Sequence, residues 1–169
     1  MKTLMILRHA KAQPHDEERD RERGLAASGR EACARVGAFM NENALFPDFI
    51  LVSDSARTRQ TLDGIAPFLP KDIPIRHDRR LYLAESPALL SQLRAVEGRY
   101  DKVLLIGHSP GCEDLALGLL HSAETKLARK MKKKFPTAAL AVLEISIPQW
   151  SDLAWGSAHL DLFVAPSDL

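Results

Sequence analysis

The chain has 169 residues, 46% of them hydrophobic, and a formal net charge of +1 at pH 7. This size and apolar content suit one domain, residues 1–169, and the near-zero charge gives no global electrostatic argument for nucleic acid or an anionic membrane as a partner. Its two cysteines are too few for a disulfide scaffold or a cysteine-rich metal site. No apolar run is long enough for a signal peptide or a membrane span, so we expect a cytoplasmic protein.

The first predicted strand is a short apolar run, residues 4–7, that ends in Arg8 and His9. In an open α/β sheet, ligands bind beyond the carboxyl ends of the strands, so this strand would deliver two basic side chains to the binding edge. Taken alone, the pair is also compatible with a solvated arginine and a structural histidine. The polar segment that follows, residues 13–24, reads as a surface loop.

The middle of the chain alternates predicted helices and strands. In order, they are a helix from Ser28 to Phe46, a strand at 49–53, a helix from Ser55 to Pro67, a weak strand at 73–75, and a helix that starts at Ser86–Pro87. Ser28 and Glu31 fit a capping box at the start of the first helix. Ser55 is the predicted N-cap of the second helix, which would place Arg57 in its first turn.

A third strand-like run, residues 102–106, ends in Gly107-His108-Ser109-Pro110-Gly111 and precedes another helical pattern. Three strand ends therefore carry two histidines and a cluster of arginines. Cys112 would lie in the first turn of the helix. There it is either an oxidation-sensitive thiol, with its pKa lowered by the helix N-terminus and nearby basic groups, or a small packed residue.

The last third of the chain begins with a basic stretch, Lys126 to Lys134, that reads as an amphipathic helix with a solvated face. Two strands are predicted at 137–147 and 159–164. Because little chain separates them, they should pair antiparallel. The pattern as a whole predicts an α/β fold.

A histidine surrounded by arginines is a poor metal site, because fixed positive charge repels a cation, but it suits a phosphoryl group. Guanidinium forks match phosphate oxygens, and nearby arginines disfavour the imidazolium form, which keeps a histidine nucleophilic near pH 7. The inference is a phosphohistidine intermediate: one histidine attacks phosphorus and water then releases phosphate. We expect no cofactor and no metal.

Three segments together resemble the motifs of the histidine phosphatase superfamily, which has the phosphoglycerate-mutase-like fold: Leu7-Arg8-His9-Ala10, Ser53 through Arg57 to Gln60-Thr61, and Gly107 to Gly111. The short length, the Arg-His-Ala form of the first motif and the Leu81-Tyr82 pair resemble its SixA-type phosphohistidine phosphatases. The resemblance implies a three-layer α/β/α sandwich on a mostly parallel mixed sheet with an antiparallel edge.

The same resemblance implies that His9 is the nucleophile, that Arg8 and Arg57 bind the phosphoryl group, and that His108 is the second active-site histidine. Arg23 lies where the family often has Arg-Pro-Leu-Thr before a helix, so it is a further candidate phosphate ligand. No nucleic acid or membrane partner is implied.

Ser109 occupies the position, directly after the second histidine, where the acid phosphatases and phytases of the superfamily carry an aspartate that protonates the leaving group. Glu85 is the one nearby carboxylate that could act as the general acid in place of that aspartate. Without such an acid, ester cleavage would be slowed by ~10² to 10⁴. The departure therefore favours phosphohistidine on a phosphotransfer or phosphocarrier protein, with a small phosphomonoester as the alternative substrate.

Two rival functions follow from the same residues. Gly107 to Gly111 also fits the Gly-x-Ser-x-Gly element of a serine esterase, with Asp152 and His159 in the chain order of a triad. Pro110 argues against it, because the residue after that serine must donate a backbone N–H to the oxyanion. The second rival is a non-catalytic module that binds phosphate or phosphohistidine and turns nothing over.

Overall fold

The computed structural model describes all residues from 1 to 169 and places six strands in one sheet, in the order β3-β2-β4-β1-β5-β6. The strands are β1 (Lys2–Arg8), β2 (Phe49–Ser53), β3 (Ile75–Asp78), β4 (Lys102–Gly107), β5 (Leu140–Ile145) and β6 (Ala158–Val164). The β1, β2, β3 and β4 strands run parallel, and β5 and β6 form an antiparallel edge next to β1. The predicted mixed sheet and the antiparallel pairing of its last two strands are confirmed.

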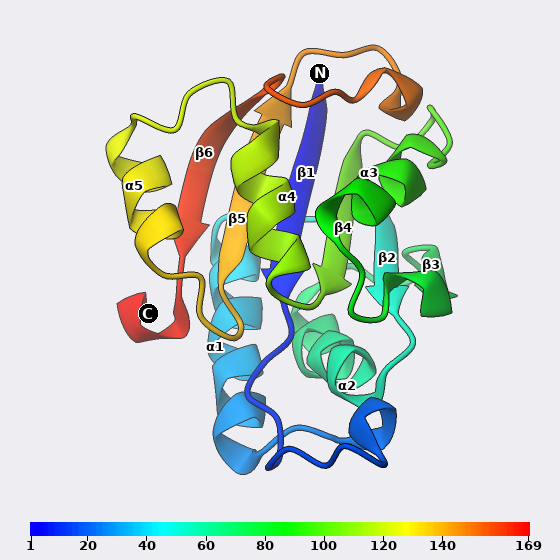
Figure 1. The fold of residues 1–169 in the computed structure, drawn as a ribbon, viewed down its shortest axis with the longest axis vertical. Coiled ribbons are helices and arrows are strands. Elements are labelled where there is room, and N and C mark those ends of the chain that lie inside the picture. The colour runs from blue at the N-terminus through cyan, green and yellow to red at the C-terminus, as the bar shows by residue number, and fades with distance from the viewer.

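Five helices cover the two faces of the sheet (Figure 1). They are α1 (Ala27–Glu42), α2 (Ala56–Ile65), α3 (Ser86–Arg94), α4 (Gly111–Leu119) and α5 (Lys126–Lys133). The α1 and α2 helices pack on one face, and α3, α4 and α5 pack on the other. This is the three-layer sandwich that the sequence predicted.

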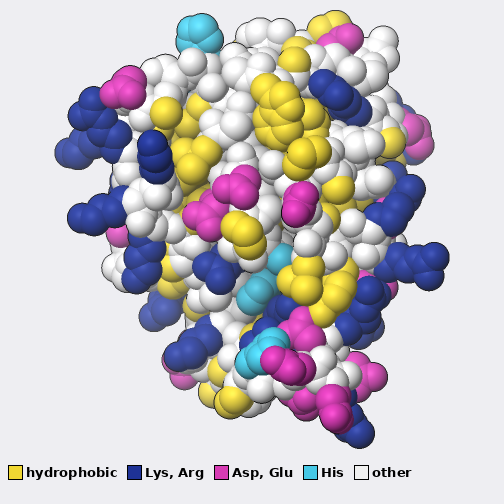
Figure 2. All heavy atoms as spheres, viewed as in Figure 1, with side chains coloured by type: hydrophobic (Ala, Val, Ile, Leu, Met, Phe, Trp, Pro, Cys, Tyr) yellow, Lys and Arg dark blue, Asp and Glu magenta, His cyan; other side chains and the backbone are white.

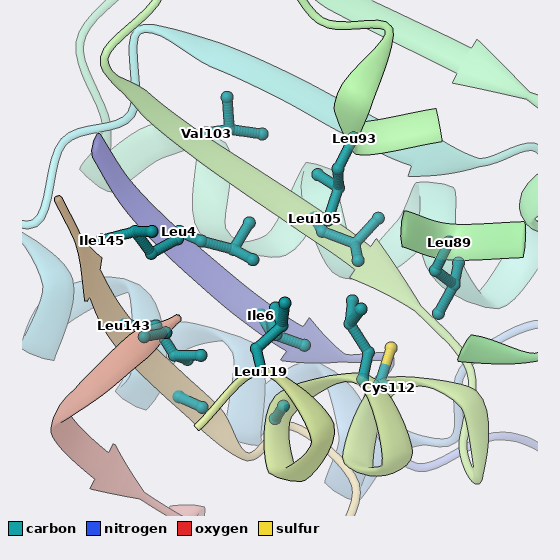
Figure 3. Close-up of a cluster of buried hydrophobic side chains, with 14 of the residues drawn as sticks. Leu4, Ile6, Leu89, Leu93, Val103, Leu105, Cys112, Leu119, Leu143 and Ile145 are labelled. Atoms are coloured by element: carbon teal, nitrogen blue, oxygen red, sulfur yellow. The ribbon is translucent and has the colours of Figure 1, made fainter. Parts of the chain in front are cut away.

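The β1 strand explains why the first apolar run is continuous rather than alternating. Leu4 and Ile6 join the core under α3 and α4, as Figure 3 shows, whereas Met5 and Leu7 join the core under α1 and α2. A strand that is covered on both faces needs apolar side chains on both sides. The strand that carries the catalytic candidates is therefore held in the centre of the molecule.

The starts of α2 and α3 agree with the sequence, whereas that of α1 differs. The Ser55 side chain caps α2 by accepting a hydrogen bond from the Thr58 N–H at 3.4 Å, and α3 begins at Ser86. The capping box at Ser28 is wrong. The α1 helix begins one residue earlier, at Ala27, and its N-cap, Ala26, makes no side-chain hydrogen bond.

Cys112 lies in the first turn of α4, as expected, but its thiol is completely buried under the sheet (Figure 3). Burial raises its pKa to about 12, and this outweighs the opposite influence of the nearby Arg8. The prediction of a reactive thiol is therefore wrong, and Cys112 is a packing residue.

The carboxyl ends of β1, β4 and β2 lie side by side, because Arg8 pairs with Gly107 and Val52 pairs with Ile106. The chain passes from β1 to β2 and later inserts β4 between them, which is the arrangement that opens a binding crevice at this edge. None of the five helices is both long and apolar enough to cross a membrane.

Candidate active site

A pocket of about 640 Å³ opens at this edge of the sheet. Five of the six predicted site residues line it: Arg8, His9, Arg23, Arg57 and His108. Figure 2 shows histidine side chains at the hollow, with basic and acidic side chains around them. Motifs from three distant parts of the sequence therefore converge on one cavity.

His9 follows directly after β1, and its side chain is buried. Its Nδ1 lies 2.7 Å from the carbonyl oxygen of Ala10. Because a carbonyl can only accept, Nδ1 carries the proton and Nε2 keeps its lone pair. Burial lowers the pKa of His9, the hydrogen bond to Ala10 opposes this, and Arg57, Arg8 and Arg23 lower the pKa further, to about 4. The ring is neutral at pH 7, and its unprotonated nitrogen can attack an electrophile.

The second motif holds the chain around His9 in place. The backbone N–H of Ala10 donates to Oγ1 of Thr61 at 3.0 Å, and that hydroxyl donates to the carbonyl of Arg57 at 2.7 Å. One residue earlier, Gln60 accepts a hydrogen bond from the Leu25 N–H at 2.8 Å. The Gln60-Thr61 pair thus fastens α2 both to the turn after β1 and to the end of the polar loop.

His108 follows β4, and its ring centroid lies 5.3 Å from that of His9. Its Nε2 is 2.9 Å from Oγ of Ser53 at the end of β2, and its buried Nδ1 has no partner. The ring of Tyr82 meets it edge-on, with 5.4 Å between centroids. Burial, followed by the proximity of His9 and Arg57, lowers the pKa of His108 to about 3. Both histidines are therefore uncharged at neutral pH.

Three arginines surround the histidines. Each has a buried Nε without a hydrogen-bond partner; both terminal nitrogens of Arg23 and Arg57 are hydrogen-bonded, whereas Arg8 uses Nη1 alone. Arg8 donates from Nη1 to the carbonyl of Phe135 at 2.8 Å. The side chains of Arg8, Arg23 and Arg57 all line the pocket, and their positive charge suits it to a phosphoryl group.

Asp20 is the site residue that the sequence did not predict. Its side-chain oxygens accept from Nη2 of Arg57 and from Nη2 of Arg23, each at 3.0 Å, and from the Tyr82 hydroxyl, while its backbone oxygen accepts from Nη1 of Arg57 at 2.7 Å. Partial burial would raise its pKa, but the hydrogen bonds from Tyr82, Arg57 and Arg23 and the charge of Arg57 lower it to about 2. Arg57 and Arg23 therefore bind a carboxylate of the protein itself.

Asp20 belongs to the segment that the sequence presented as a surface loop, within a short 3₁₀ turn, Asp20–Glu22. The single signal in the sequence was its position three residues before the candidate phosphate ligand Arg23. Tyr82 belongs to the Leu81-Tyr82 pair noted in the sequence. Its ring contacts that of His108, and its hydroxyl donates a hydrogen bond to Asp20.

Glu85, the candidate general acid, does not line this pocket. It is exposed and lines a neighbouring hollow of about 440 Å³, which shares His108 and Ser109 with the main pocket. The assignment of Glu85 as the general acid stays a prediction. The structure places Glu85 and His108 in the lining of the same neighbouring hollow.

The serine esterase is excluded by the sheet register. Ser109 follows the carboxyl end of β4, whereas His159 pairs with Glu144, which in turn pairs with Thr3 at the start of β1. These positions lie at opposite ends of the sheet, several strand residues apart at ~3.3 Å each. No triad of Ser109 and His159 can form.

Comparison with known proteins agrees with this geometry. Residues 4–82 match the sequence model of branch 1 of the histidine phosphatase superfamily. An uncharacterised protein of Mycobacterium tuberculosis is 32% identical over 164 residues, which cover 95% of this chain and 99% of that protein.

Two solved structures, each provisionally named phosphohistidine phosphatase SixA, share the fold. The protein from Nakamurella multipartitia is 26% identical, with a TM-score of 0.86 over 98% of this chain and 96% of that one. The protein from Agrobacterium tumefaciens is 29% identical, with a TM-score of 0.82 over 98% of both chains. The likeness extends over almost the whole chain.

The contacts of Asp20 predict the effect of neutralising it. In Asp20→Asn the shape is kept but the negative charge is lost, so Arg57 and Arg23 should bind inorganic phosphate roughly five- to tenfold more tightly, a gain of about 1 kcal/mol. Titration calorimetry with phosphate measures this, and Glu18→Gln, in the same loop, is the control. Weaker binding in Asp20→Asn would show instead that Asp20 serves to hold Arg57 in position.

The two buried histidines predict how stability depends on pH. Their folded pKa values of about 4 and about 3 lie below the unfolded value of ~6.5, so the unfolded chain binds more protons as the pH falls from 6.5 toward 4. The free energy of unfolding should fall over that range by up to about 1.4 kcal/mol per pH unit for each histidine. Above pH 6.5 this contribution to stability is fully present.

Urea unfolding at pH 7, 6 and 5 tests this dependence. The double variant His9→Gln/His108→Gln should show a flatter pH dependence than the native protein, whereas His159→Gln, on the far end of the sheet, should leave the slope unchanged. Equal slopes in the native protein and the double variant would disprove the assignment.

Proposed function

The chain belongs to branch 1 of the histidine phosphatase superfamily, and from that premise we propose that it hydrolyses phosphohistidine on a phosphotransfer or phosphocarrier protein. One observation carries the proposal: a neutral His9, with Nε2 free to attack, lies in a pocket that Arg8, Arg23 and Arg57 also line. The names of the two solved relatives, each provisionally a phosphohistidine phosphatase, point to the same substrate class.

In the proposed reaction, Nε2 of His9 attacks phosphorus while the P–N bond to the substrate imidazole breaks. The three phosphoryl oxygens are bound by Arg8, Arg57 and Arg23. They replace the Asp20 carboxylate as hydrogen-bond acceptors for Arg57 and Arg23. The leaving imidazole keeps the electron pair of the broken bond and takes a proton from solvent. A water molecule then attacks the phosphorus on His9, which releases inorganic phosphate and restores the neutral ring.

His108 takes a supporting role in this scheme. The Ser53 hydroxyl, 2.9 Å away, can donate to Nε2 of His108, which leaves the ring proton on the unpartnered Nδ1. That N–H is buried, so it donates to a phosphoryl oxygen only if the ring turns when substrate binds. Because burial and the neighbouring positive groups keep the pKa of His108 at about 3, we assign it hydrogen bonding and not proton delivery near pH 7.

The carboxylates of the pocket support phosphohistidine over an ordinary ester. Two of them, Asp20 and Glu17, line it. Asp20 is a poor proton donor, because its pKa is about 2, and Glu17 is exposed to solvent. An alkoxide leaving group would depart without a proton, whereas an imidazole leaves readily. A small phosphomonoester is the second candidate substrate, and it would need Glu85 to act from the neighbouring hollow.

The proposed roles predict different defects for two variants. His9→Ala should abolish turnover, because no covalent intermediate can form, whereas Arg57→Ala should chiefly weaken phosphoryl binding and transition-state stabilisation. Rapid acid quenching of the native enzyme during turnover, followed by peptide mapping, should find acid-labile phosphate on His9. Phosphate on His108 or on any serine would overturn the assignment, and the absence of turnover on every substrate would favour a binding module.

The lack of an acid predicts the substrate preference. We expect kcat/KM for a phosphohistidine protein to exceed that for simple alkyl phosphates by at least ~10²-fold, or roughly 2.7 kcal/mol of transition-state stabilisation. Rates on a series of aryl phosphates should depend steeply on the pKa of the leaving group. Comparable efficiency on both substrate classes, or loss of alkyl-phosphate turnover alone in Glu85→Gln, would show that an acid is present.

A further inference from the structure

A second groove, of about 530 Å³, lies beside the active site between α1, α5 and the C-terminal segment; we call it the basic groove. Its cations are Lys11, Arg35, Lys130, Lys133 and Lys134. Its apolar lining comes from Ala32, Pro136, Phe163, Ala165 and Pro166. Figure 2 shows Lys and Arg side chains gathered along the edge of the molecule that α5 forms in Figure 1.

The basic groove carries positive charge that the protein leaves uncompensated. Its one carboxylate, Asp168, pairs with Lys130 at 2.8 Å, and none of the other four cations forms an ion pair. The whole chain has a net charge of only +1, so the basic groove is far more positively charged than the protein as a whole. Such a concentration of charge attracts a negatively charged ligand and orients it.

The basic groove adjoins the catalytic pocket, because Lys11 and Thr137 line both. The phosphate-site residue Arg8 also binds the carbonyl of Phe135, two residues after α5 ends. A substrate segment next to the phosphohistidine therefore lies within reach of the groove between α1 and α5.

We propose that the basic groove seats an acidic segment of the phosphorylated protein, close to its phosphohistidine. This inference rests on the proposed function and adds the recognition element. Lysines are flexible point charges that suit scattered carboxylates, whereas a second phosphate would favour paired guanidinium groups, and the groove has one arginine. The apolar lining suits the aliphatic stems of Glu side chains and any apolar residues between them.

Helix α5 and its C-cap, Lys134, offer a matched pair of variants. Lys133→Gln/Lys134→Gln removes two charges that line the groove, and Lys126→Gln/Lys132→Gln removes two exposed charges that do not. The change in net charge is identical, and all four side chains are exposed, so neither variant should unfold the protein. Any difference in ligand affinity between the two variants is therefore due to the groove and not to nonspecific electrostatic attraction.

Binding is measured first, by fluorescence anisotropy with a short labelled peptide of Glu, Asp and Leu that carries no phosphate. At 0.1 M salt, the groove variant should bind about tenfold more weakly than the native protein, and the control variant less than twofold. His9→Ala should bind like the native protein. Equal losses in the two lysine variants, no binding by the native protein, or tighter binding of phosphatidylserine vesicles or of an oligonucleotide would overturn the proposal.

Kinetics complete the test. On a phosphohistidine protein with an acidic surface, the groove variant should lose about tenfold in kcat/KM through KM, whereas hydrolysis of a small phosphoramidate should be unchanged. Failure of the proposed function is distinguishable, because the native protein would then bind the acidic peptide yet release no phosphate from phosphohistidine. Equal losses on the protein and the small substrate would count against the groove.

Discussion

The guanidinium of Arg57 imposes the central constraint on this structure. The residue is 2% exposed, and a positive charge removed from water in this way is stable only beside a negative partner with matching hydrogen-bond geometry. Asp20 supplies that partner through both its side chain and its backbone oxygen. The path of the polar loop, the place of Tyr82 and the orientation of Arg23 all follow from this pairing, because each of these groups also contacts Asp20.

The positive charge of Arg57, which requires Asp20 as its partner, also helps to keep the two histidines neutral. Burial lowers the pKa values of His9 and His108 but raises that of Asp20, whereas the arginines lower the pKa values of all three groups. One cluster therefore contains nucleophilic nitrogens that are unprotonated and a carboxylate that stays ionised at neutral pH. Neither state is an intrinsic property of the residue type, since both arise from the neighbours that the fold provides.

The sequence predicted most of the fold because its signals were local. The apolar runs that end in Arg8, Ser53 and Gly107 are continuous, as buried parallel strands must be, and their ends carry the motifs. The predictions from sequence were wrong or incomplete where contacts between residues far apart in the chain determine the local structure. The start of α1 is set by a backbone hydrogen bond from Ala26 to Lys11 and not by Ser28, and Cys112 responds to burial more than to its helix N-terminus. Asp20 was missed because its partner Arg57 lies 37 positions away.

The two halves of the site are anchored with very different strength. His9 extends from β1, which is paired on both sides, so displacing it would break two ladders of backbone hydrogen bonds and expose core. The 3₁₀ turn that carries Asp20 has no buried residue, and polar contacts are what bind it to the rest. In hydrogen exchange, amides of β1 would exchange near the limit set by global unfolding, while those of the turn would exchange by local opening. The nucleophile thus belongs to a slowly opening part of the protein, and Asp20 belongs to a turn that opens without exposing core.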